Sequence, residues 1–207
     1  MNTKSLRWVV ALPSEARAIR EHFAMQSAGV ENGFRLFRTA DKSNWLVISG
    51  IGKSRAAEAT RLLHEFSEAP AWSAWINVGI CGHGSAALGS VHLGHKIVDG
   101  ASGVVTYPGL AYERPCPTST VFTVDDVELG YCEPVAYEME ASGFLQAIKG
   151  LCGTDLIAVL KVVSDTPAAS TEGITAQKIH QWMTAQIHVI SQLAMTLGEL
   201  SESESLR

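Results

Sequence analysis

Four acidic side chains lie where the sequence predicts that strands give way to helices or turns. Glu15 follows a first apolar run, Glu138 and Glu140 precede an apolar helical segment, and Asp165 directly follows a run rich in Leu, Ile and Val. Carboxyl groups can accept and donate protons, so a cluster of them can perform general acid–base catalysis. Ligands of α/β proteins bind outside the carboxyl ends of parallel strands, which is where these acids are expected.

Each acid also has an ordinary structural explanation. Glu15, and the pair Glu138 and Glu140, fit acids at a helix N-terminus, where the helix dipole favours negative charge. Asp165 is followed by Thr166 and Pro167, and it fits a turn. In an extended chain Glu138 and Glu140 would point the same way, whereas on a helix they would diverge by about 200°. The occurrence of all four acids at the ends of three predicted strands is harder to explain by local structure alone than the position of any single acid.

The elements that would position these acids alternate along the chain. The expected strands are 6–12, 34–38, 45–49, 75–80, 96–98, 121–124 and 156–163, and the expected helices are 15–23, 53–66, 141–148 and 172–197. The run 156–163 lacks alternation, which favours a parallel sheet covered on both faces. The pattern predicts a single α/β domain over residues 1–198. The Ser- and Glu-rich segment 199–207 is expected to be a solvated tail.

Composition excludes several classes of protein. The chain has 207 residues, of which 46% are hydrophobic and 18% charged, with a formal net charge of −5, so it can bury a sizeable core. No basic block favours DNA or RNA as a partner. No apolar run approaches the roughly 18 residues of a membrane span, and the N-terminus lacks the length of a signal peptide. The four cysteines are scattered, which favours a cytoplasmic protein without a disulfide framework.

A glycine-rich segment and a pair of histidines are candidates for a cofactor site and a metal site. Residues 82–87 fit the Gly-x-Gly-x-x-Ala pattern of dinucleotide-binding folds, but Gly89 and Gly94 leave no room for the helix that should follow. A nicotinamide-dependent enzyme is therefore a weak alternative. His92 and His95 are expected in a surface turn, without a metal. Three glycines are expected to let the backbone approach a small ligand: Gly79, Gly82 and Gly84.

Five segments occur in the order and spacing of the purine nucleoside phosphorylase superfamily, and they resemble most closely the methylthioadenosine/S-adenosylhomocysteine nucleosidases. The segments are Val-Ala-Leu-Pro-Ser-Glu at 10–15, Ser-Gly-Ile-Gly-Lys at 49–53, Ile-Asn-Val-Gly-Ile-Cys-Gly at 76–82, Tyr-Glu-Met-Glu-Ala at 137–141 and Val-Ser-Asp at 163–165. The resemblance implies a three-layer α/β/α sandwich with a mixed, largely parallel sheet. It also implies no cofactor, a nucleoside as substrate, and a homodimer or higher homo-oligomer.

The resemblance implies a role for each matched residue. Asp165 matches the general acid that hydrogen-bonds N7 of the purine, and Glu15 matches the acid that orients the attacking water, with Glu138 assisting. Met139 matches the methionine under the ribose, and Glu140 the carboxylate that accepts from the ribose hydroxyls. Phe122 lies about where an aromatic ring stacks on the purine. The other residues expected to bind substrate are Ser164, Ile51, Ile80, Cys81 and Gly82.

The implied reaction suits these residue types. Cleavage of an N-glycosidic bond builds positive charge on the sugar, and the departing purine must be neutralised by a proton. Asp165 must therefore be held in its neutral form, which burial beside an apolar strand favours. Glu140, in contrast, is expected to stay ionised and to favour the cationic sugar electrostatically.

Water is expected to be the nucleophile. The phosphorylases of the superfamily carry a Gly-Asp-Pro segment and an Arg-Val-Gly-Ser segment, and this chain has Pro-Ser-Glu at 13–15 and Asn-Val-Gly-Ile at 77–80 instead. Arg17 or Arg55 could still reach a phosphate, so a phosphorylase is the alternative.

Two departures from the nucleosidases leave the substrate open. Ile80 replaces their serine, and the segment 98–121 is short and lacks their helix. The group at the 5′ position is therefore undetermined; methylthioadenosine is not assured, and adenosylhopane and futalosine would also suit. A nucleoside-binding sensor without turnover is a further alternative. The aromatic residues considered for the 5′ region are Tyr107, Tyr112 and Phe144.

Overall fold

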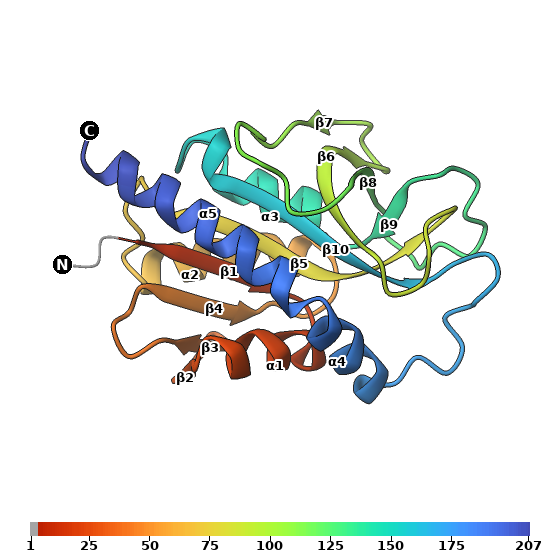
Figure 1. Ribbon diagram of the computed structural model, residues 1–207, viewed down its shortest axis with the longest axis horizontal. Helices are drawn as coiled ribbons and strands as arrows, with labels where there is room; N and C mark the ends of the chain where they lie inside the picture. Colours follow the sequence, from red (N-terminus) through yellow and green to blue (C-terminus); the bar gives the residue numbers. More distant parts are fainter. Residues whose placement is uncertain (1–3) are drawn as a thin grey trace.

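Ten strands form one sheet in the computed structural model, which describes residues 4–207 (Figure 1). The strands are β1 (Leu6–Val10), β2 (Gln26–Glu31), β3 (Phe34–Arg38), β4 (Asn44–Ile48), β5 (Ala74–His83), β6 (Val91–Asp99), β7 (Val105–Thr106), β8 (Thr118–Thr123), β9 (Ala136–Glu138) and β10 (Ile157–Asp165). The helices are α1 (Pro13–His22), α2 (Lys53–Phe66), α3 (Ala141–Ile148), α4 (Ala176–Ala185) and α5 (Ile187–Ser205), with a 3₁₀ turn at Thr154–Leu156.

The sheet closes on itself at one end. Its order is β10-β6-β8-β9-β5-β1-β4-β3-β2, and β10 also pairs with β5, so five strands form a ring. The pairings of β1 with β4 and β5, and of β5 with β10, are parallel, whereas β3 with β4 and β6 with β10 are antiparallel. The expected mixed α/β domain is confirmed. A plain three-layer sandwich is not confirmed, because the closed ring departs from an open sheet between two helical layers.

Helices cover the sheet on both sides. One buried cluster joins α1, α4 and α5 to β1, β5 and β10, and a second joins α2 and α3 to the opposite side chains of the same strands. In Figure 1, α5 crosses in front of the sheet and α2 and α3 lie behind it. Every residue of β10 is buried, as the lack of alternation in the run 156–163 predicted.

The crossing of α2 and α3 depends on Gly143. A Cβ atom at this position would lie 1.9 Å from the carbonyl oxygen of Lys53, so only glycine lets the two backbones approach this closely. The approach also brings the start of α2 to the residue before α3, where the Gly52 N–H donates to Glu140 Oε1 at 2.9 Å. This contact fixes one of the predicted acids.

Several boundaries differ from those expected. The expected helix 172–197 is two helices that meet at Gln186, and the second continues to Ser205. The segment 199–207 is therefore not a solvated tail throughout: Ser201 is buried, and its Oγ accepts the Ser5 N–H at 3.1 Å. His92 and His95 lie in strand β6 rather than in a turn. No helix follows 82–87, in agreement with the weak dinucleotide pattern.

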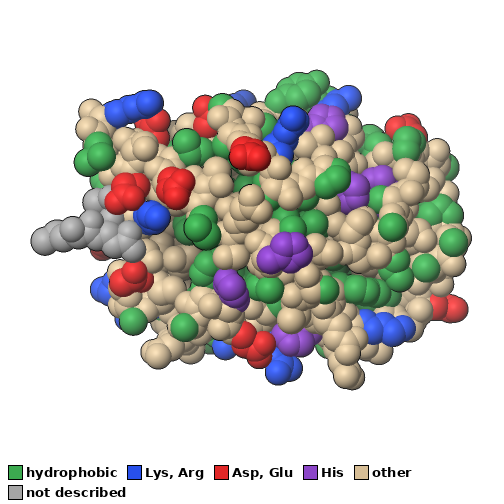
Figure 2. Space-filling view, viewed as in Figure 1, with side chains coloured by type: hydrophobic (Ala, Val, Ile, Leu, Met, Phe, Trp, Pro, Cys, Tyr) green, Lys and Arg blue, Asp and Glu red, His purple; other side chains and the backbone are tan. Residues whose placement is uncertain are grey.

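The face drawn in Figure 2 shows no basic patch. On the face drawn in Figure 2, Lys and Arg side chains are dispersed among acidic ones. Among residues 4–207, no helix combines the length and the apolar character needed to cross a membrane.

Candidate active site

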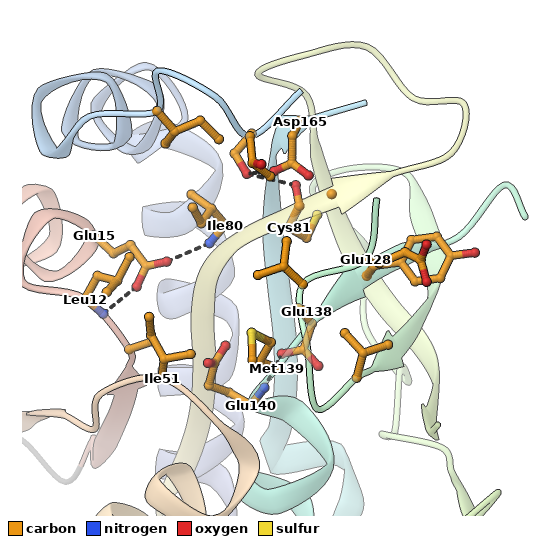
Figure 3. A pocket seen from close by; sticks show the side chains of 18 residues that line it. Leu12, Glu15, Ile51, Ile80, Cys81, Glu128, Glu138, Met139, Glu140 and Asp165 are labelled. Atoms are coloured by element: carbon orange, nitrogen blue, oxygen red, sulfur yellow. Dashed lines mark hydrogen bonds between the residues drawn. The ribbon is translucent and has the colours of Figure 1, made fainter. Parts of the chain in front are cut away.

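A cavity of about 160 Å³ lies at the carboxyl ends of β1, β5 and β10 (Figure 3). The residue after β1 and the first turn of α1 form one wall, the end of β5 forms the floor, and the segment from β9 into α3 forms the opposite wall. The lining residues are Ala11, Leu12, Glu15, Ile51, Ile80, Cys81, Gly82, Val124, Val127, Glu128, Tyr137, Glu138, Met139, Glu140, Ser164, Asp165, Thr171 and Ile174.

The structure brings together every predicted site residue except Phe122. The prediction for Phe122 is wrong in position, because its ring packs beside Tyr137, with 6.2 Å between ring centroids, and does not line the cavity. Tyr137, from the neighbouring strand β9, provides the aromatic lining instead. It lies next to Glu138 in the Tyr-Glu-Met-Glu-Ala segment, so that motif was a signal for it.

Glu15 is held by two backbone donors. Its Oε2 accepts the Leu12 N–H at 2.7 Å and its Oε1 accepts the Ile80 N–H at 2.8 Å, as the dashed lines in Figure 3 show. Burial raises the pKa of Glu15 to about 7; the charge of Glu140 adds to this, and the two backbone donors and Lys161 act in the opposite direction. A carboxyl group with this pKa can exchange a proton near neutral pH.

Gly79 serves this carboxyl group rather than a ligand. A Cβ atom at position 79 would lie 2.9 Å from Glu15 Oε1, so the glycine makes room for the acid. The expectation that Gly79 admits a small ligand is therefore wrong, because the protein's own side chain occupies the space.

Glu138 is paired with a buried lysine that sequence reasoning missed. Lys161 Nζ lies 2.8 Å from Glu138 Oε2, and both side chains are almost fully inaccessible. Burial lowers the pKa of Lys161, but Glu138 and Glu140 outweigh this effect and raise it, so the ammonium is charged. A lysine inside the apolar run 156–163 was the available signal, since buried lysines are almost always paired.

Glu138 also orients the turn into α3. Its Oε1 accepts the Thr123 hydroxyl at 2.6 Å, and its Oε2 accepts the Glu140 N–H at 2.9 Å. Burial raises the pKa of Glu140 and Glu138 adds to this, against the opposing charge of Lys161. This direction differs from the expectation that Glu140 simply stays ionised.

Asp165 is buried at the end of β10 with both carboxyl oxygens engaged. The Ser164 hydroxyl donates to its Oδ1, and the Tyr131 hydroxyl donates to its Oδ2. Tyr131 comes from the segment between β8 and β9 and lies against Gly82. The sequence around Tyr131 has no periodicity that would have placed it at the site.

The cavity lacks a basic lining residue, and the two arginines considered for phosphate lie elsewhere. Arg17 Nε pairs with Glu21 at 2.7 Å on the surface of α1. The Arg55 guanidinium lies 4.4 Å from the centroid of the Phe34 ring. Among the described residues, no group of three His, Cys, Asp or Glu side chains could hold a metal ion. The site is therefore acidic and does not favour an anion.

The aromatic residues considered for the 5′ group do not line the cavity. Tyr107 is exposed, Tyr112 packs against the first core cluster, and Phe144 is fully buried in the second. Aliphatic and hydroxyl side chains line the cavity instead, among them Leu12, Ile51, Thr171 and Ile174.

At the level of sequence, the chain matches no protein-family model and no curated protein. Solved structures nevertheless share its fold along nearly the whole chain. The methylthioadenosine/S-adenosylhomocysteine nucleosidase of S. pneumoniae, solved with a transition-state inhibitor, is 19% identical with a TM-score of 0.70, and the match covers 95% of this chain and 98% of that one.

Two further structures are similar to the same degree. The methylthioadenosine nucleosidase of Arabidopsis thaliana is 16% identical with a TM-score of 0.72, and 97% of each chain is covered. A futalosine hydrolase mutant of Helicobacter pylori is 11% identical with a TM-score of 0.73, covering 93% of this chain and 98% of that one. The chain thus has the fold of these nucleosidases, as its five motif segments predicted.

Proposed function

We propose that this protein is a purine nucleosidase that hydrolyses the N-glycosidic bond of a 5′-modified adenosine-like nucleoside. The observation that carries the proposal is the convergence of Glu15, Glu138, Glu140 and Asp165 on one buried cavity. The fold shared with nucleosidases that act on 5′-modified adenosines supports the same reaction class.

The reaction is a displacement at the anomeric carbon of the sugar. The C–N bond breaks, its electron pair goes to the purine, and Asp165 gives a proton to the ring nitrogen facing it. Water forms the new C–O bond, and Glu15 accepts its proton. In its ionised form Glu140 stabilises the cationic sugar, because oriented charges in a buried site act strongly, whereas Lys161 compensates the charge of Glu138.

Water is proposed as the nucleophile because phosphate lacks a binding group. The cavity lining contains no arginine or lysine, and the one buried lysine, Lys161, is neutralised by Glu138. The pKa of Glu15, about 7, suits a base that takes a proton from water.

A screen of nucleosides for base release tests the proposal. Methylthioadenosine, S-adenosylhomocysteine, futalosine, adenosine and inosine would each be incubated with the protein, with and without inorganic phosphate, and free base measured by chromatography. We expect release from at least one 5′-modified nucleoside at a rate independent of phosphate. Release that requires phosphate would replace the hydrolase with a phosphorylase.

A nucleoside-binding sensor is the second candidate, favoured by Ile80. At this position the side chain is apolar, and its backbone N–H is already used by Glu15. Calorimetric titration with the same nucleosides decides between the two, since binding without base release at any pH between 5 and 9 would identify a sensor.

A homo-oligomer stays a prediction that rests on the resemblance, and a cytoplasmic location stays a prediction that rests on the scattered cysteines. The segment around β7 has exposed apolar side chains, at Val104, Val105 and Tyr107, that a second copy could cover. Light scattering on the purified protein would give the oligomeric state.

A further inference from the structure

A ring of the protein itself lies against one end of the cavity, at Gly82 and Asp165. A Cβ atom at position 82 would lie 2.5 Å from Tyr131 Cε1, so the missing side chain of Gly82 opens a flat slot that the Tyr131 ring fills. The slot ends at Asp165, whose Oδ2 accepts the Tyr131 hydroxyl. The space beside the proposed general acid is therefore shaped for an aromatic ring.

With Tyr131 in this slot, the remaining cavity is too small for a nucleoside. Its volume is about 160 Å³. Sites for small molecules generally measure about 300–1,000 Å³. The free space is lined by Glu15, Met139 and Glu140, where the sugar would bind, and it reaches Gly82 and Asp165, which the Tyr131 phenol contacts. A base can enter only if the phenol leaves.

Besides this side chain, the segment that carries Tyr131 contacts the body at Gly84, whose N–H donates to the Val135 carbonyl oxygen at 3.3 Å and where a Cβ atom would lie 2.0 Å from the Glu133 carbonyl oxygen. Its other hydrogen bonds are local: the N–H groups of Gly130 and Tyr131 donate to Glu128 Oε1, and the Glu133 N–H donates to the Tyr137 hydroxyl. Tyr131 has a φ of +43°, a left-handed conformation that bulky residues rarely adopt. Leu129, at the tip, is 67% exposed. Besides its hydrogen bond to Asp165, the ring contacts Tyr137, with 6.1 Å between the ring centroids.

Displacement of the phenol would also free the acid. A carboxyl oxygen that accepts the Tyr131 hydroxyl cannot at the same time give a proton to a purine nitrogen. The same movement therefore empties the ring slot and releases Asp165 Oδ2, while Ser164 stays bonded to Oδ1.

We propose that Tyr131 gates the base end of the site and determines which bases enter it. Its ring occupies the place of the leaving base, and its hydroxyl occupies the hydrogen-bonding position on Asp165. A ligand must supply both a flat ring for the slot over Gly82 and a polar ring atom for Asp165. The inference rests on the proposed function, and it adds a residue that selects the base.

Binding of free adenine tests the gate without requiring turnover. Titration calorimetry would compare the wild type with Tyr131→Phe, which keeps the ring but loses the hydroxyl, and with Tyr131→Ala, which empties the slot. The matched control is Leu129→Ala, in the same segment but outside the cavity. A buried hydrogen bond shifts an equilibrium by up to about tenfold, and a closed gate weakens apparent affinity in proportion.

We therefore expect adenine to bind Tyr131→Phe about tenfold more tightly than the wild type, and Tyr131→Ala at least as tightly as Tyr131→Phe. Leu129→Ala should match the wild type. In base-release assays Tyr131→Phe should lower KM more than it changes kcat, a split that loss of packing alone would not produce. If Tyr131→Ala does not fold, Tyr131→Phe decides.

Two failures can be told apart. If the wild type binds adenine or releases base and the Tyr131 variants bind adenine no more tightly, the gate is wrong and the nucleosidase stands. If neither the wild type nor any variant binds adenine, and none of them releases base, the slot is not a base site, and both the gate and the proposed function are wrong.

Discussion

Glu15 is the acid of the site whose pKa burial raises to about 7. It is 2% exposed and lies near the charge of Glu140. As the base that takes a proton from water, it acts only when ionised, and its ionised fraction grows as the pH rises through the pKa. The activity should therefore increase with pH across this range.

We expect kcat/KM for base release to rise between pH 6 and 8 with a midpoint near the Glu15 pKa of about 7. Glu15→Gln should lose this rise and about 10²–10⁴-fold in rate, the usual contribution of a positioned base. Glu65→Gln, on the exposed side of α2, is the control. An unchanged profile in Glu15→Gln would assign the base to another group.

Substitution of Asp165 should affect turnover separately from nucleoside affinity. Asp165→Asn preserves the shape of the side chain but cannot protonate the leaving base. We expect turnover to fall by about 10²–10⁴-fold while nucleoside affinity, measured by calorimetry, changes only a few-fold. Wild-type activity in this variant would mean that the purine receives its proton from elsewhere.

At the scale of elements, Gly143 lets α3 approach α2 closely. Gly143→Ala places a Cβ 1.9 Å from the Lys53 carbonyl oxygen, so the helices must separate, and α3 carries the acids at its start. We expect destabilisation of about 1–3 kcal/mol, the usual cost of overpacking, although alanine favours a helix. Chemical denaturation would measure it.

Gly153→Ala is the matched control for this prediction. A Cβ there meets nothing within 4 Å and the residue has no positive φ, so its stability should be unchanged within about 0.5 kcal/mol. Equal stability of the two variants would contradict the argument for the helix crossing.

The strands and helices with strong hydrophobic patterns were predictable from the sequence, and the weak ones were not. β10, α2 and α3 lie close to their expected positions because their buried residues follow a regular pattern of apolar side chains in the sequence. β2 is almost wholly exposed and β9 has three residues, so neither has a period to detect.

The same limit applies to the site. Motif segments placed Glu15, Glu140 and Asp165 correctly in the cavity. Phe122 was misplaced because its orientation depends on the register of β8 with β9. Tyr131 escaped prediction because a loop residue reaches Asp165 only through a contact across 34 positions of sequence.

At the scale of the molecule, the C-terminal turns of α5 join the two ends of the chain. The Ser5 N–H donates to the buried Ser201 Oγ, and Ser5 Oγ bonds with Ser73 Oγ at 2.9 Å. Deletion of residues 200–207 should lower Tm by several degrees, because it removes a buried hydrogen bond and the packing of Leu200.

Deletion of residues 206–207 alone is the control, since both are exposed. Thermal unfolding followed by circular dichroism would compare the two deletions. Equal Tm values for both deletions and the full chain would restore the view of 199–207 as a dispensable tail.

The closed ring of five strands has a consequence for self-association. Strands inside a ring have partners on both sides, which leaves β2 as the one long margin of the described sheet where a foreign strand could add. The edge strand β2 is a poor partner for a foreign strand. Its pairing with β3 shifts register between Ser27 and Gly29, and it ends in the charged Glu31. A fold rich in β-structure is thereby protected against growing into fibrils from its own edge.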